Sequence, residues 1–99
     1  MSNNQNYERD LNGKVALVTS GTKGIGKAIA ARLARAGAKV IITARHHPGE
    51  VNSAYHFIAA DLSITQEVAK VAGEIEALYG GVDILVNNLG ANTLSLIHI

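Results

Sequence analysis

The sequence predicts an α/β protein built around a parallel sheet, and three observations point to this fold class. Apolar runs typical of buried strands alternate with segments of helical spacing. A turn with glycines at positions 21, 24 and 26 joins the first apolar run to the first helical segment. The alternation of strands and helices favours right-handed crossovers. We therefore expect a doubly wound sheet, of which these residues supply a first half with strand order 3-2-1-4.

The first strand and helix are the clearest elements. Residues 15–18 are uncharged and apolar, which is typical of a strand buried on both faces. Residues 27–36 have helical spacing, with Ile29 and Leu33 on one face. Gly37 follows as the expected end of this helix.

The later elements follow the same order. Ser63 and Gln66 have the spacing of a capping box, so we expect a helix from there to about Tyr79, ended by the glycines at 80 and 81. About ten residues link the second strand to the third, near the minimum for a crossover, so a full helix is not expected there. The remaining strands are expected at residues 39–43, 55–59 and 82–86.

The glycine turn carries the first functional indication. Glycine at a strand-to-helix turn removes the Cβ atoms that would keep a ligand away from the backbone. The N–H groups and positive dipole end of the following helix then suit a phosphate. Gly26-Lys27 is followed by Ala28, so a Walker-type ATP loop is not indicated. The alternative is a turn that only allows strand and helix to pack closely.

Two motifs resemble those of the short-chain dehydrogenase/reductase family. Residues 19–26, TSGTKGIG, are similar to the motif T-G-x-x-x-G-x-G, with Ser20 in place of the first glycine. Residues 87–90, NNLG, are similar to N-N-A-G, with Leu89 in place of alanine. The resemblance covers Leu11 to about Thr93. It implies a Rossmann-type fold and hydride transfer between NADP(H) and a carbonyl or alcohol carbon of a small-molecule substrate.

The cofactor preference rests on two basic residues. The second strand ends in Thr43-Ala44-Arg45, without the acidic residue that NAD-preferring folds place there to hold the ribose hydroxyls. An arginine can instead form a fork onto a 2′-phosphate, and Lys23 adds a second cation, so NADP is favoured over NAD. The alternative is that both are solvated surface cations.

The resemblance implies further contacts with the cofactor. Asp61 occupies the position that binds the adenine amino group, Leu62 the wall of the adenine pocket, and Asn88 a position near the ribose. For Asp61 the alternative is helix capping or a solvated loop. The expected cofactor-binding residues are Ser20, Gly21, Thr22, Lys23, Gly24, Ile25, Gly26, Arg45, Asp61, Leu62, Asn88 and Gly90.

No catalytic residue is assigned. The family uses a tyrosine and a lysine in a Y-x-x-x-K motif, and none of Tyr7, Tyr55 and Tyr79 has a lysine four positions later. We therefore expect a parent oxidoreductase whose cofactor-binding part is represented here, the 99 residues themselves being inactive. A non-catalytic nucleotide-binding or redox-sensing module is the alternative.

The composition indicates which classes of binding partner are not expected. The net charge of +1 and 47% hydrophobic content imply neither nucleic acid nor membrane as a partner. The absence of cysteine fits a cytoplasmic protein. His46, His47 and His56 lack the spacing of metal ligands, so packing or surface roles are expected and no metal is assigned. The resemblance implies a homo-oligomeric parent protein.

Three regions are expected along the chain. Residues 1–10 are polar and are predicted to form a flexible tail, neither a signal peptide nor an anchor. Residues 11–93 are predicted to form the partial NAD(P)-binding domain. Residues 94–99, LSLIHI, match an in-frame translation of a transposase adaptor used in DNA sequencing, so we expect a non-native tail there.

Overall fold

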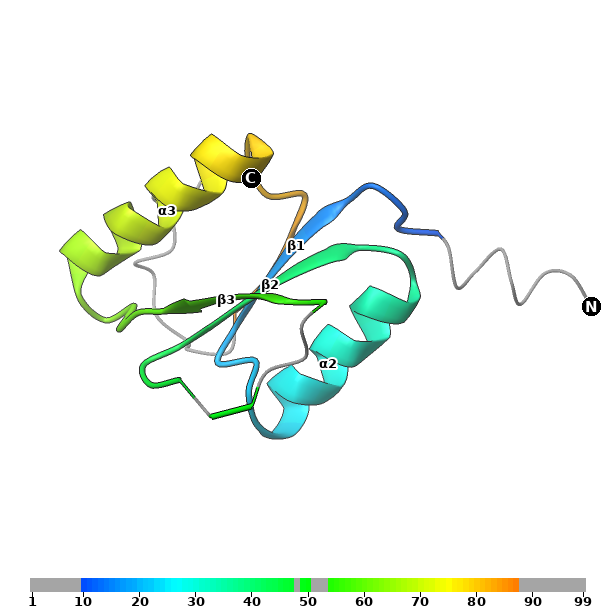
Figure 1. Cartoon of the computed structure of the whole chain (residues 1–99), viewed down its shortest axis with the longest axis horizontal. Coiled ribbons are helices and arrows are strands. Elements are labelled where there is room, and N and C mark those ends of the chain that lie inside the picture. The colour runs from blue at the N-terminus through cyan, green and yellow to red at the C-terminus, as the bar shows by residue number, and fades with distance from the viewer. Residues whose placement is uncertain (1–9, 48, 51–53, 88–99) are drawn as a thin grey trace, which may run out of the picture.

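A four-stranded parallel sheet lies between two helices in the computed structural model, which describes residues 10–47, 49–50 and 54–87. The helices cover opposite faces of the sheet (Figure 1). The strand order is β3-β2-β1-β4, which confirms the predicted fold class. The elements are β1 (Val15–Thr19), α2 (Gly24–Arg35), β2 (Lys39–Ala44), β3 (His56–Ala59), α3 (Thr65–Tyr79) and β4 (Ile84–Val86).

Strand β1 is the centre of the structure. All five of its residues are buried, and it pairs with β2 on one side and β4 on the other. Val15 and Leu17 belong to the core beneath α3, whereas Val18 belongs to the core beneath α2. Because successive side chains of a strand point to opposite faces, β1 contributes to both cores.

The same alternation extends into β2. Ile41 faces the α3 core, and Val40 and Ile42 face the α2 core. Helix α3 contributes three fully buried residues to its core, namely Val68, Val71 and Ile75. Helix α2 contributes Ala30 to the buried core, and Leu33 and Ala34 are partly buried against it.

The helix ends differ in part from those expected. Helix α2 already begins at Gly24, three residues before the predicted range. Gly37 has a left-handed φ of 98° just after the helix, as expected for a glycine at a helix end. Gly80 ends α3 with a φ of 81°.

The predicted capping box of α3 is wrong. The residue preceding the helix is Ile64, and no side chain caps it. The hydroxyl of Ser63 donates instead to Oδ1 of Asp61, at 2.6 Å. The side chain that reaches back is that of Glu67, whose Oε1 accepts a hydrogen bond from the Asp61 N–H at 2.6 Å.

Strands β3 and β4 are shorter than predicted. Strand β3 begins at His56 rather than at residue 55, and β4 begins at Ile84 rather than at residue 82. Before β4, Asp83 makes a different kind of link to β1: its Oδ2 accepts the N–H of Val15, and its own N–H donates to the Val15 carbonyl, both at 2.8 Å. The described part of the link between β2 and β3 contains no helix, in agreement with its length.

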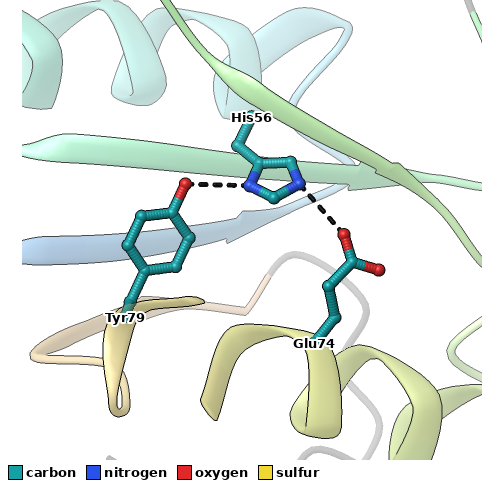
Figure 2. A network of polar contacts seen from close by, with 3 residues as sticks. All are labelled: His56, Glu74 and Tyr79. Atoms are coloured by element: carbon teal, nitrogen blue, oxygen red, sulfur yellow. Dashed lines mark hydrogen bonds and ion pairs between the residues drawn. The ribbon is translucent and has the colours of Figure 1, made fainter. Parts of the chain in front are cut away.

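A polar network connects β3 to α3 (Figure 2). Nδ1 of His56 lies 2.8 Å from the Tyr79 hydroxyl, and Nε2 lies 3.0 Å from Oε2 of Glu74. An ionised carboxylate only accepts hydrogen bonds, so Nε2 of His56 donates to the Glu74 carboxylate. His56 thus has the packing role expected from the sequence.

Neither helix of the described residues has the length and apolar character needed to cross a bilayer.

Candidate cofactor-binding site

A cleft of about 480 Å³ lies where strands β1, β2 and β3 end. Its volume falls within the range of small-molecule sites, about 300–1,000 Å³. The carboxyl ends of the strands are where open α/β sheets bind their ligands. The lining residues are Ser20, Thr22, Lys23, Thr43, Ala44, Arg45, His46, Ala60, Asp61, Leu62 and Ser63.

Gly21 lets the turn pack against β2. It is buried, and its N–H donates to the carbonyl of Thr43 at 3.4 Å. A Cβ at this position would lie 2.7 Å from Cγ2 of Ile42 and 3.2 Å from the Val18 carbonyl oxygen. For this glycine, close packing of the turn is therefore sufficient to explain the residue type.

Gly24 is different because it faces open space. Its φ is +55°, and a Cβ there would meet nothing within 4 Å. It is the first residue of α2, whose first turn, as described, has neither an acidic residue nor a side-chain cap. The positive end of the helix dipole is therefore not neutralised by a side chain of that turn. An anionic group such as a pyrophosphate fits this position.

Ser20, which stands where the motif has its first glycine, adopts a left-handed backbone conformation. Its φ is 54°, and it is the one non-glycine residue with a positive φ in the described part of the chain. A left-handed conformation costs an L-residue about 1–2 kcal/mol. Ser20 lines the cleft, so this strained corner forms part of the site.

Charged side chains reach the cleft from three elements. Lys23 comes from the turn before α2, Arg45 from the end of β2 and Asp61 from the end of β3. Hydrogen bonds from the side chain and the backbone N–H of Ser63, helped by the positive charge of Arg45, hold the pKa of Asp61 below its ordinary value of 3.8. Asp61 is therefore an ionised hydrogen-bond acceptor at neutral pH.

The structure brings half of the predicted residues together. Ser20, Thr22, Lys23, Arg45, Asp61 and Leu62 line the cleft. Gly21, Gly24, Ile25 and Gly26 do not line it: Gly26 is buried in α2, and Ile25 is 75% exposed. Asn88 and Gly90 lie outside the described residues.

Sequence reasoning missed five lining residues, which are Thr43, Ala44, His46, Ala60 and Ser63. Their positions at or just after the ends of β2 and β3 could have indicated that they line the cleft. His46 is exposed, in agreement with the surface or packing role expected from the sequence, and it also lines the cleft. Within the described residues, no group of three or more histidine, cysteine or acidic side chains could hold a metal ion.

The fold and the site define a class of protein. A parallel sheet ordered β3-β2-β1-β4, with a glycine turn between β1 and the first helix, is one half of a Rossmann-type dinucleotide-binding domain. The family model for short chain dehydrogenases matches residues 14–98. The chain therefore belongs to the short-chain dehydrogenase family, whose members bind a nicotinamide cofactor and act on small molecules.

Curated relatives agree with this family. The chain is 43% identical over 93 residues to the 3-oxoacyl-[acyl-carrier-protein] reductase FabG of Aquifex aeolicus, covering 84% of this chain and 38% of the relative. It is 38% identical over 88 residues to the farnesol dehydrogenase of Aedes aegypti, covering 79% of this chain and 36% of the relative. The chain thus spans little more than a third of these relatives.

Solved structures show the same fold. The ligand-free aldohexose dehydrogenase of Thermoplasma acidophilum matches with a TM-score of 0.73 and 40% identity, over 81% of this chain and 31% of that one. A metagenomic short-chain oxidoreductase in complex with NADP matches with a TM-score of 0.73 and 36% identity, over 82% of this chain and 41% of that one.

Proposed function

We propose that the cleft binds NADP(H), and that the chain is the cofactor-binding part of an oxidoreductase acting on a carbonyl or alcohol substrate. One observation carries this proposal. Lys23 and Arg45 come from separate elements and line the same cleft, beside the glycine turn. The residues directly after β2 are Arg45, His46 and His47, so no carboxylate stands at the strand end to hold the ribose hydroxyls of NAD. The similarity to a short-chain oxidoreductase in complex with NADP supports the assignment.

Different residues of the cleft bind different parts of the cofactor. The guanidinium of Arg45 donates to the 2′-phosphate, and Lys23 adds a mobile positive charge. The start of α2 receives the pyrophosphate, to which Gly24 leaves access. The Asp61 carboxylate accepts a hydrogen bond from the adenine amino group, and Leu62 forms an apolar wall. Asn88 and Gly90 remain predicted contributors.

We assign binding, not turnover, to these 99 residues. The bound nicotinamide supplies the hydride donor or acceptor, but the sequence contains no Tyr-x-x-x-Lys motif to move the proton. The chain also spans only 38% of a curated reductase that it matches. We expect no oxidation of NADPH by this chain with any carbonyl compound. The partial domain at residues 11–93, a cytoplasmic location and a homo-oligomeric parent remain predictions.

The test is the variant Arg45→Asp. One charge-assisted contact with phosphate is worth about 1.5–3 kcal/mol, so we expect NADP affinity to fall about ten- to a hundred-fold while NAD affinity is retained or improves. Isothermal titration calorimetry with both cofactors measures the change. Lys39→Asp is the matched control, because Lys39 begins the same strand about 20 Å from Arg45. If Arg45→Asp still binds NADP more tightly than NAD, Arg45 does not select the cofactor.

A further inference from the structure

We propose that His46 is a third donor to the 2′-phosphate of the cofactor, and that at low pH its positive form strengthens the binding of NADP, but not of NAD, relative to a variant that lacks the imidazole. The inference rests on the proposed function of the cleft. It adds a specificity-determining residue and a pH dependence to that function.

The placement of His46 follows from the end of β2. The strand ends at Ala44, and the chain bends at Arg45 and His46. In a continuing strand, two consecutive side chains would point to opposite faces of the sheet. At the bend both residues line the same cleft. His46 therefore lies beside the arginine that we assign to the phosphate.

The next residue, His47, has different surroundings. Its ring packs edge-on against Phe57, with ring centroids 4.8 Å apart and planes at 70°. Its Nδ1 accepts the N–H of Gly49 at 3.1 Å. Phe57 packs against the core beneath α2, and His47 is not among the residues that line the cleft. Two neighbouring histidines thus differ in their access to the site.

The charges around His46 explain why the ligand and the proton are coupled. Lys23 from the glycine turn and Arg45 from the end of β2 are cations, and Asp61 from the end of β3 is the one carboxylate among the lining residues. Asp61 already accepts two hydrogen bonds from Ser63. A phosphate dianion that accepts a hydrogen bond from a histidine favours the positive form of that histidine. Histidine is the side chain that ordinarily changes charge between about pH 5 and pH 8.

The phosphate itself also titrates. As the pH falls below about 6, a phosphate monoester takes up a proton and loses negative charge. This change weakens the attraction of NADP to the cations of the cleft at low pH. The effect of His46 is therefore measured as the ratio of the dissociation constants of a variant and the wild type at each pH. NAD has no 2′-phosphate, so its ratio should not depend on pH.

The experiment uses the full chain and its variants His46→Gln and His47→Gln, titrated calorimetrically with NADP and with NAD from about pH 5.5 to about pH 8.0. Glutamine keeps hydrogen-bonding capacity but cannot become positive. For His46→Gln we expect the NADP ratio to rise to about two- to fivefold at low pH, the size of a solvent-exposed ion pair, and to approach one at high pH. His47→Gln should give a ratio near one throughout. Circular dichroism checks that both variants fold.

The possible results separate the two proposals. If His46→Gln matches the wild type at low pH while Arg45→Asp loses NADP, the role of His46 is refuted and the cofactor assignment stands. If His47→Gln reproduces the effect of His46→Gln, the pH dependence does not come from the cleft and the inference fails. If the wild type does not prefer NADP over NAD at any pH, both proposals fail.

Discussion

Replacing Gly21 with alanine tests how the glycine turn is held against the sheet. The added Cβ would lie 2.7 Å from Cγ2 and 3.2 Å from Cγ1 of Ile42, and 3.2 Å from the Val18 carbonyl oxygen. Ile42 is 2% exposed on a central strand, so its branched side chain has little room to move. The turn must therefore shift away from β2, or Ile42 must leave its preferred rotamer.

The expected magnitude comes from two opposing effects. Overpacking a well-packed core costs about 1–3 kcal/mol. Alanine also restricts the unfolded chain, which favours folding by about 0.4–1 kcal/mol. Gly21 is not in the left-handed region, so no backbone strain is added. We expect a net loss of about 1–2 kcal/mol in the free energy of unfolding.

Gly73→Ala is the matched control. Gly73 lies inside α3, is exposed, and would place its Cβ in open space. Alanine is favoured over glycine within a helix by about 0.5–1 kcal/mol, so this variant should gain stability by that amount. The same chemical change is thus expected to have opposite signs at the two positions.

Urea unfolding followed by far-ultraviolet circular dichroism measures both variants. A double-mutant cycle with Ile42→Ala adds a specific test, because removing the side chain of Ile42 should reduce the cost of the new Cβ at position 21. The packing argument is refuted if Gly21→Ala is as stable as the wild type while Gly73→Ala gains stability. It also fails if the cost at position 21 is unchanged when Ile42 is truncated.

Three further predictions concern the polar contacts and the strained corner. Ser20→Gly should raise the free energy of unfolding by up to about 1 kcal/mol in urea denaturation, because the left-handed strain of serine exceeds the entropic cost of glycine. Ser63→Ala removes a hydrogen bond that lowers the pKa of Asp61, so that pKa should rise toward 3.8 in a carboxyl NMR titration. The lowered pKa of Asp61 stabilises the folded state fully when the pH is above the pKa of Asp61 in the unfolded chain. This stabilisation is lost as the pH falls through the pKa of Asp61 in the folded state. The free energy of unfolding of Ser63→Ala should therefore approach that of the wild type in strong acid. Tyr79→Phe removes the hydrogen bond to His56 and should cost about 0.5–1.5 kcal/mol in urea denaturation.

Each of these predictions has its own control. Ser20→Ala keeps the strain and should gain nothing, and a loss of stability in Ser20→Gly would contradict the strain argument. Ser63→Thr keeps the hydroxyl, so it should leave the pKa of Asp61 low, and an equal rise in both variants would exclude the hydroxyl as the cause. Tyr79→Leu should cost more than Tyr79→Phe because it also removes the ring that packs against the α3 core. Equal stability of Tyr79→Phe and the wild type would show that the hydrogen bond to His56 contributes nothing.

The parts of the fold that depend on local pattern were predictable from the sequence. The uncharged run at residues 15–18 indicated a strand buried on both faces, and the observed burial of β1 confirms it. The alternation of strands and helices indicated a parallel sheet, and the Rossmann-type fold that the resemblance implied gave the strand order, which the structure confirms. Strand burial and element type follow from side-chain periodicity, which a single sequence displays directly.

Features that depend on competition between neighbouring groups were not predictable. The spacing of Ser63 and Gln66 satisfied the capping-box pattern, but Asp61 lies two residues earlier and takes the Ser63 hydroxyl. His46 was missed because a bend, and not a continuing strand, places it beside Arg45. The packing role of Gly21 depends on Ile42, which lies on another strand. The nucleotide contacts assigned to the cleft stay predictions.

The central position of β1 also determines when its two neighbouring strands become available during synthesis. Its neighbour β2 ends at Ala44, whereas its other neighbour β4 ends at Val86. At about 5–20 residues per second, a ribosome needs about 2–8 s to make the chain between those two points. Throughout that interval one hydrogen-bonding edge of a largely apolar strand has no native partner, which makes the nascent chain a candidate for chaperone binding. Only the synthesis of β4 allows the second edge of β1, the first strand to be made, to form its hydrogen bonds.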